Sequence, residues 1–264
     1  MPPLMTKLVD LDFRSEVPVF DSNVALGRRH DRRVPGATPD DLLTEMDRFD
    51  IERALVYCQH AVTFDAGEGN RMLLEMLGGH RDRLIPQFAF NPAYDNLETF
   101  VKSTSDADVR SVRIAPVQHK YPLRSWVAGE FIAWAAGLER PGELPQEPIP
   151  VWVSAFDVDP SQLADLLETV PALKIVLCEP HYTQIPWIVP LLRARPNLYV
   201  ELSRAVIGDA IPRLIEAAGH SRVLHGSWWP EGSLAAQLYA LNRCGLDEEK
   251  LSAICAGNLE GLLR

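Results

Sequence analysis

The sequence predicts a single α/β domain, a (β/α)8 TIM barrel that spans residues 1–264. Eight short runs rich in Val, Ile, Leu and Phe follow one another, as expected for parallel strands buried on both faces. These runs begin roughly 25 to 40 residues apart, the length of one strand–helix unit. A chain of 264 residues without a low-complexity linker is also typical of one such barrel.

The predicted strands are separated by segments with helical patterns and caps. Thr38-Pro39 should begin a helix over LLTEMDRF, Asp159-Pro160 should begin one over SQLADLLETV, and Gly78 should end NRMLLEML. The predicted strands are 17–21, 53–58, 84–90, 109–115, 149–155, 174–178, 198–203 and 222–227. Further helices are predicted at 125–138, 185–195, 209–218, 232–243 and 247–263.

A doubly wound open sheet is the alternative fold. Such a sheet usually has a Gly-rich phosphate loop after its first strand, whereas DSNVALGRRH contains one glycine. Prolines follow several strand runs, at Asn91-Pro92, Ala115-Pro116, Glu179-Pro180 and Trp229-Pro230. Proline cannot donate to a sheet, so these pairs mark the loops at the end of the barrel where active sites are built.

Composition narrows the range of partners. The chain has 26 Lys and Arg against 36 Asp and Glu, a formal net charge of -10, so we expect no nucleic-acid partner. The four cysteines form no CxxC pair, which argues against a disulfide framework and a structural zinc site. MPPLMTKLVDLDFRSE has no apolar signal core and no run is long enough for a membrane span. We therefore expect a cytoplasmic protein with a small-molecule substrate and no membrane partner; homo-oligomerisation stays open.

Polar residues stand where the predicted strands end, and the barrel would bring them to one pocket. The set combines carboxylates, imidazoles and guanidinium groups, which suits general acid–base chemistry and the binding of a carboxylate. Its members are Asp21, Asn23, Gln59, His60, Arg113, His119, Ser154, Glu179, His181, Glu201, Ser203, Arg204, His225, Ser227 and Trp228.

Five ordered segments resemble a known family. VFDSNVALG, LKIVLCEPH, NLYVELS, RVLHGSWWP and AGNLEGLLR are similar to signatures of the amidohydrolase superfamily, in its amidohydrolase-related branch of hydrolases, decarboxylases and lactonases. The resemblance implies the barrel fold and a divalent metal site at the strand ends. Its ligand positions fall on Asn23, Ala25, Ser154, Glu179 and Trp228. Alanine and tryptophan supply no metal ligand, so we expect no cofactor and no bound zinc.

An oxygen-rich magnesium or manganese site is the alternative if Asp21, Asn23, Glu179, His181 and Glu201 converge. The resemblance also extends to a lactonase branch regarded as metal-independent, although that branch keeps an aspartate where this chain has Trp228. Such chemistry needs a base and cations that hold the substrate. We expect Asp21, Glu179 and His225 as catalytic candidates. The expected substrate-binding residues are Asn23, Arg113, His119, His181, Ser203, Arg204 and Trp228.

The sequence thus predicts a hydrolase that acts on a small carboxylated or cyclic, lactone-like substrate without zinc. Two alternatives stay open: a decarboxylase of an aromatic or unsaturated carboxylic acid, and a non-catalytic barrel that binds a small molecule or a partner protein. Structural roles are also open for single residues. Asp21 could serve only to bind neighbouring backbone, Arg113 only to neutralise Glu179 or Glu201, and His225 only to fill the core.

Overall fold

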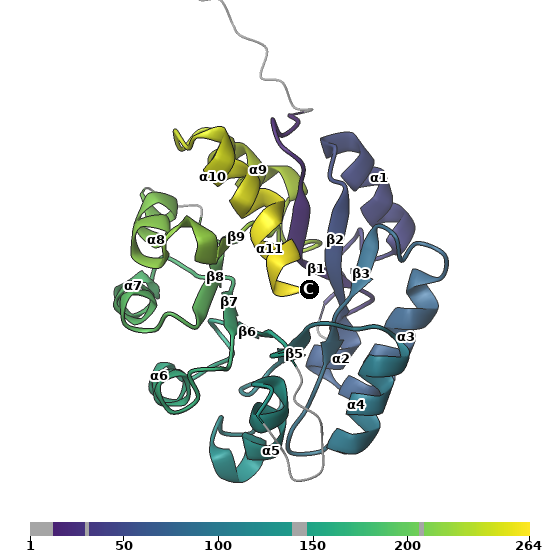
Figure 1. The fold of residues 1–264 in the computed structure, drawn as a ribbon. Coiled ribbons are helices and arrows are strands. Elements are labelled where there is room, and N and C mark those ends of the chain that lie inside the picture. Colours follow the sequence, from purple (N-terminus) through teal and green to yellow (C-terminus); the bar gives the residue numbers. More distant parts are fainter. Residues whose placement is uncertain (1–12, 30–31, 139–146, 206–208) are drawn as a thin grey trace, which may run out of the picture.

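The computed structural model describes residues 13–264 except 30–31, 139–146 and 206–208, and strands and helices alternate around a ring (Figure 1). All strand pairs are parallel, in the order β1-β2-β3 and β4-β5-β6-β7-β8-β9. The strands are β1 (Phe20–Leu26), β2 (Arg53–Cys58), β3 (Leu84–Pro86), β4 (Phe88–Ala89), β5 (Val112–Ile114), β6 (Val151–Ser154), β7 (Ile175–Cys178), β8 (Leu198–Glu201) and β9 (Val223–Leu224).

Hydrogen bonds at two places join the sheets into a barrel. Gln87, between β3 and β4, donates its backbone N–H to Val56 O at 2.8 Å, so β3 and β4 act as one strand. On the other side, Ser22 N–H donates to His225 O at 3.1 Å and Ala25 N–H to Trp229 O at 2.7 Å. The predicted (β/α)8 TIM barrel is therefore confirmed, with the segment after β9 lying against β1.

Helices surround the strands. The predicted caps form: the Thr38 side chain accepts the N–H of Asp41, and Asp159 accepts those of Ser161 and Gln162. The helices are α1 (Pro39–Phe49), α2 (Gln59–Thr63), α3 (Ala66–Leu77), α4 (Leu97–Asp106), α5 (Ser125–Ala135), α6 (Pro160–Thr169), α7 (Ile185–Ala194), α8 (Ala210–Ala218), η1 (His220–Arg222), α9 (Leu234–Asn242), α10 (Glu248–Ser252), the π-helical η2 (Ala253–Gly257) and α11 (Asn258–Leu262).

Several elements differ from the sequence prediction. The predicted 84–90 strand is divided into β3 and β4, and the predicted strands 109–115, 149–155, 198–203 and 222–227 are shorter in the structure, as β5, β6, β8 and β9. The first strand is not 17–21 but Phe20–Leu26, because Ser22 and Asn23 are polar yet buried and continue the strand. Helix α4 was not predicted, since its Ser- and Thr-containing sequence LETFVKSTSD has few apolar residues. The last predicted helix, 247–263, is divided by η2.

Helix α11 closes one end of the barrel. It lies across the centre of the ring in Figure 1, and Leu259 and Leu262 join a buried cluster with Phe20 and Trp152 inside the barrel. Phe20 is the first residue of β1, so this closed end is the N-terminal end of the strands. Any pocket on the barrel axis must therefore open at the opposite end, where the strands finish.

Two sequence predictions on composition can be compared with the described residues. The four cysteines are free thiols, as expected without a disulfide framework. None of the helices in the described ranges has the length and apolar character needed to cross a bilayer.

Candidate active site

Asn23 lies at the centre of a buried polar cluster at the C-terminal ends of the strands. A register shift in β1 between Asp21 and Val24 places this residue out of the regular ladder. Its Oδ1 accepts a hydrogen bond from Arg113 Nη2 at 2.7 Å, and its Nδ2 donates to Glu201 Oε2 at 3.1 Å. Asn23 therefore links the guanidinium group from β5 with the carboxyl group from β8.

Glu201 is fully buried at the end of β8 and accepts hydrogen bonds from several donors. Besides Asn23, the backbone N–H of Glu179 donates to its Oε2 at 3.1 Å and the Ser203 hydroxyl at 2.9 Å, while the N–H of Ser203 donates to Oε1. Burial raises the pKa of Glu201 to about 8, although the N–H of Glu179 acts in the opposite direction. Glu201 thus holds the backbone of its neighbour, Glu179.

Glu179 follows β7 with φ 60°, in the left-handed region that non-glycine residues rarely adopt. The hydrogen bond from its N–H to Glu201 stabilises this conformation. The Ser154 hydroxyl donates to Glu179 Oε2 at 2.8 Å, and Arg113 Nη1 lies 3.7 Å from Oε1. Asn23 Nδ2 also donates to Oε1 at 3.5 Å, so the carboxylate is held by two neutral donors and one cation.

Asp21 and His225 form a second buried group beside this cluster. Asp21 Oδ1 accepts the backbone N–H groups of Asn23 and Ser227, each at 3.0 Å, and so ties β1 to the segment after β9. Burial raises the pKa of Asp21, and the nearby His225 lowers it; burial also lowers the pKa of His225. The structural role that the sequence left open for Asp21 is thus present in the geometry.

A cavity of about 230 Å³ opens above the cluster. Glu179, Arg113, Ser154, Tyr57 and Trp228 are among its lining residues, whereas Asp21 and His225 are not. Its wall also includes Asp157, three residues beyond the end of β6, whose Oδ1 accepts the N–H of Gln118 at 2.6 Å. Burial raises the pKa of Asp157 to about 7.

The sequence did not mark Asp157, and it marked Glu201 only as a possible ligand of an oxygen-rich metal site or as an ion-pair partner of Arg113. The only signal for Asp157 was an acidic residue soon after a predicted strand, in SAFDVDP. Many surface turns carry aspartate in this position, so the pattern alone could not mark it.

Arg204 lies beside this cavity, between two aromatic rings. Its guanidinium carbon is 4.5 Å from the ring centroid of Phe156 and 4.5 Å from that of Trp228. The backbone of Trp228 is in the left-handed region, with φ 60°, and its N–H donates a hydrogen bond to Asn23 O at 3.0 Å. The arginine is therefore oriented by cation–π contacts from two different loops.

The other predicted histidines lie outside the hydrogen-bonded cluster, and His60 Nε2 is 3.2 Å from Glu68 Oε2. His181 Nδ1 is 2.9 Å from the Thr183 hydroxyl, and its ring packs 4.2 Å from that of Tyr182. His119 packs near Tyr121, with 6.5 Å between ring centroids, and burial lowers its pKa. The structure thus brings together Asn23, Arg113, Ser154, Glu179, Glu201 and Ser203, and it leaves His119 and His181 outside this hydrogen-bonded group.

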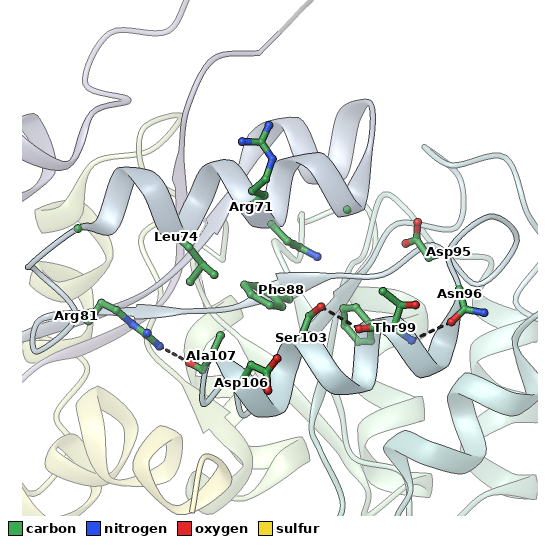
Figure 2. Close-up of a pocket in the computed structure, with 14 residues that line it drawn as sticks. Arg71, Leu74, Arg81, Phe88, Asp95, Asn96, Thr99, Ser103, Asp106 and Ala107 are labelled. Carbon is green, nitrogen blue, oxygen red and sulfur yellow. Dashed lines mark hydrogen bonds between the residues drawn. The ribbon is translucent and has the colours of Figure 1, made fainter.

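A larger cavity of about 760 Å³ lies between α3 and α4 on the outside of the barrel (Figure 2). Phe88 and Leu74 lie in it together with polar side chains such as Ser103 and Thr99. Arg81 already donates to the carbonyl of Ala107. None of the residues of the buried cluster lines this cavity, so the chemistry of the cluster does not extend to it.

A family model for amidohydrolases matches residues 16–264. The chain belongs to the amidohydrolase family. No curated protein matches it.

Solved structures with the same fold include members of this family. An uncharacterised TIM-barrel protein from Bordetella bronchiseptica is 16% identical, with a TM-score of 0.73 over 94% of this chain and 98% of that one. A 5-carboxyvanillate decarboxylase from Sphingomonas paucimobilis is 14% identical, with a TM-score of 0.69 over 94% and 99%. An amidohydrolase from Burkholderia multivorans with bound zinc is 16% identical, with a TM-score of 0.71 over 94% and 99%. These likenesses support the fold.

The residues at the amidohydrolase ligand positions do not fit a divalent metal. Ala25 and Trp228 offer no side-chain acceptor, Ser154 Oγ donates to Glu179, and Asn23 Oδ1 is occupied by Arg113. In the described part of the chain, no three His, Cys, Asp or Glu side chains are grouped to hold a metal. Of the five residues of the oxygen-rich alternative, Asn23, Glu179 and Glu201 come together, whereas Asp21 Oδ1 binds backbone N–H groups and His181 Nδ1 lies beside Thr183.

Proposed function

We propose that this amidohydrolase-family chain is a hydrolase that opens a small carboxylated or cyclic, lactone-like substrate without a bound divalent metal. The observation that carries the proposal is the cavity at the strand ends, which Glu179 and Asp157 line together with Arg113. Two carboxyl groups in different environments beside one cation are a suitable set for general acid–base hydrolysis.

The roles follow from the surroundings of each group. Glu179, held by Ser154 and Arg113, accepts a proton from the attacking water. Asp157, whose pKa is raised to about 7, is partly protonated near neutral pH and donates a proton to the leaving oxygen. Arg204, oriented by Phe156 and Trp228, binds the substrate carboxylate.

Decarboxylation is the second candidate function. It is favoured by the aromatic rings of Tyr57, Phe156 and Trp228 on the cavity, which suit a flat aromatic acid. The solved structures of similar fold include 5-carboxyvanillate and 2,6-dihydroxybenzoate decarboxylases. A barrel that binds a ligand without turnover is the third outcome that an experiment must separate.

A panel of lactones and aromatic carboxylic acids tests the proposal on the purified protein. Ring opening is followed by proton release, decarboxylation by release of CO2, and binding by thermal shift. We expect ring opening to fall at least about 100-fold in Glu179→Gln. The control is Glu75→Gln, whose side chain is 65% exposed on α3.

Full activity in Glu179→Gln would remove this residue from the mechanism. CO2 release without ring opening would establish the decarboxylase instead, and a thermal shift with no product would establish a binding protein. Elemental analysis of protein prepared without chelators tests the metal claim, since stoichiometric zinc would contradict it.

A further inference from the structure

We propose that the guanidinium of Arg113 is the built-in cation of this centre and occupies the place of the divalent ion that the amidohydrolase ligand positions imply. This inference rests on the proposed function for its chemical role, and on contacts of the chain alone for its location.

The location follows from two of the ligand positions. Arg113 Nη2 donates to Asn23 Oδ1 at 2.7 Å, and Nη1 lies 3.7 Å from Glu179 Oε1. Asn23 and Glu179 stand at the first-strand and sixth-strand ligand positions of the family. The side chain that contacts both of them is thus a cation of this chain.

The guanidinium is held in one orientation. Its Nε donates to Gln87 Oε1 at 2.9 Å, and Gln87 Nε2 in turn donates to the Ser111 hydroxyl at 3.3 Å. The ring of Tyr57 covers one face, with 3.9 Å between its centroid and the guanidinium carbon. A planar group fixed by hydrogen bonds at two edges and by a ring needs no rearrangement when substrate arrives.

The positive charge of Arg113 offsets the negative charge of a buried carboxylate. Arg113 is 3% exposed, Glu179 8% and Glu201 0%, so two acidic side chains and one basic side chain share a site with little water. A buried charge without a partner is costly, and the guanidinium 3.7 Å from Glu179 Oε1 lowers that cost. A divalent ion in the same cluster would compete with Arg113 for Asn23 Oδ1 and would repel the guanidinium.

The chemical consequence lies in the cavity, which Arg113 also lines. A fixed guanidinium beside Glu179 stabilises negative charge that develops on the substrate when water attacks. Lysine would keep the charge, but it lacks the planar fork that contacts Gln87, Asn23 and Glu179 together.

The experiment removes the cation and returns it as a small molecule. Arg113→Ala deletes a group equivalent to ethylguanidinium, and ethylurea is a neutral molecule of nearly the same shape. We expect Arg113→Ala to unfold at a lower temperature, ethylguanidinium to recover part of the lost Tm, and ethylurea to recover none. Arg110→Ala is the control, because its side chain is 57% exposed and near the same strand.

Three further measurements complete the test. The Tm of the wild-type protein should not change with a chelator or with added Mn²⁺ or Zn²⁺. Arg113→Lys should fold and, with a substrate found in the panel, lose at least about 10-fold in kcat. This lysine variant keeps the test decisive if Arg113→Ala does not fold.

Several results would overturn the inference. They are stoichiometric divalent metal in the wild-type protein whose removal lowers its Tm, equal recovery by ethylurea and ethylguanidinium, and wild-type kcat in both Arg113 variants. The metal content and Tm measurements need no substrate. Failure of the proposed hydrolysis is therefore distinguishable from failure of the cation assignment.

Discussion

Adding one methyl group at Gly226 tests the buried cluster, because Gly226 lies directly against Glu201. A Cβ on Gly226 would lie 2.3 Å from Glu201 Oε1 and 2.6 Å from its Cδ, whereas ordinary contacts begin at 3.4 Å. In Gly226→Ala the carboxylate must therefore move by about 1 Å. Glu201 is fully buried and binds the N–H of Glu179, so this movement breaks hydrogen bonds that no water can replace.

The magnitude follows from these two costs. Overpacking a buried site costs about 1–3 kcal/mol, and leaving a buried hydrogen-bonding group without its partner costs about 1–3 kcal/mol, so Gly226→Ala should lose about 2–6 kcal/mol of unfolding free energy. Urea unfolding of the variant and the wild-type protein measures this difference in unfolding free energy. The control is Gly129→Ala in α5, where the new Cβ meets Ser125 at 3.7 Å and alanine should stabilise the helix by about 0.5–1 kcal/mol. A Gly226→Ala protein within about 0.5 kcal/mol of wild type would refute the packing argument.

Two further predictions concern the cavity. Because the pKa of Asp157 is raised from 3.8 to about 7, the folded protein binds a proton more tightly than the unfolded chain, and its stability falls as the pH rises through this window. At ~1.4 kcal/mol per pKa unit, the free energy of unfolding that the wild-type protein loses reaches about 4 kcal/mol. The asparagine side chain cannot titrate, so the free energy of unfolding of Asp157→Asn should rise relative to that of the wild type between pH 4 and pH 8. Curves of unfolding free energy against pH that run parallel for the two proteins would contradict this. Arg204→Gln should weaken binding of benzoate about 10-fold, but not of neutral benzamide, in calorimetric titrations. Arg193→Gln is the control, because the Arg193 side chain is 60% exposed. An equal loss of affinity for benzoate and benzamide in Arg204→Gln, or a similar loss of benzoate affinity in the control, would contradict a carboxylate-binding role for Arg204.

The sequence predicted the barrel well because its strands are buried on both faces and therefore appear as short apolar runs. The predicted 53–58 strand matches β2, and the predicted 174–178 strand differs from β7 by one residue. Helix α4 was missed because tertiary packing of Phe100, more than its own Ser- and Thr-containing sequence, stabilises it.

The candidate site was predicted less completely, since strand ends show which residues approach one another but not which of them bind. Glu201 was one strand-end carboxylate among several in the sequence. Its central position depends on the N–H of Glu179 and on Asn23, which are 22 and 178 residues away along the chain. Glu179 follows β7, which pairs with β8, but only closure of the barrel between the first and last strands brings Asn23 to Glu201.

The residues at the ligand positions that the resemblance implies make contacts of their own, and these contacts link the buried cluster with the cavity. Asn23 has both an acceptor and a donor, so it can bridge Arg113 and Glu201, which a metal-binding histidine could do only by giving up the metal. Trp228 cannot bind a metal, but its ring orients Arg204 beside the cavity. The sequence shows only the missing ligands. The fold shows that two arginines, one at the buried cluster and one beside the cavity, stand next to the substituted positions, so the site has exchanged a bound cation for cations of its own, as we propose.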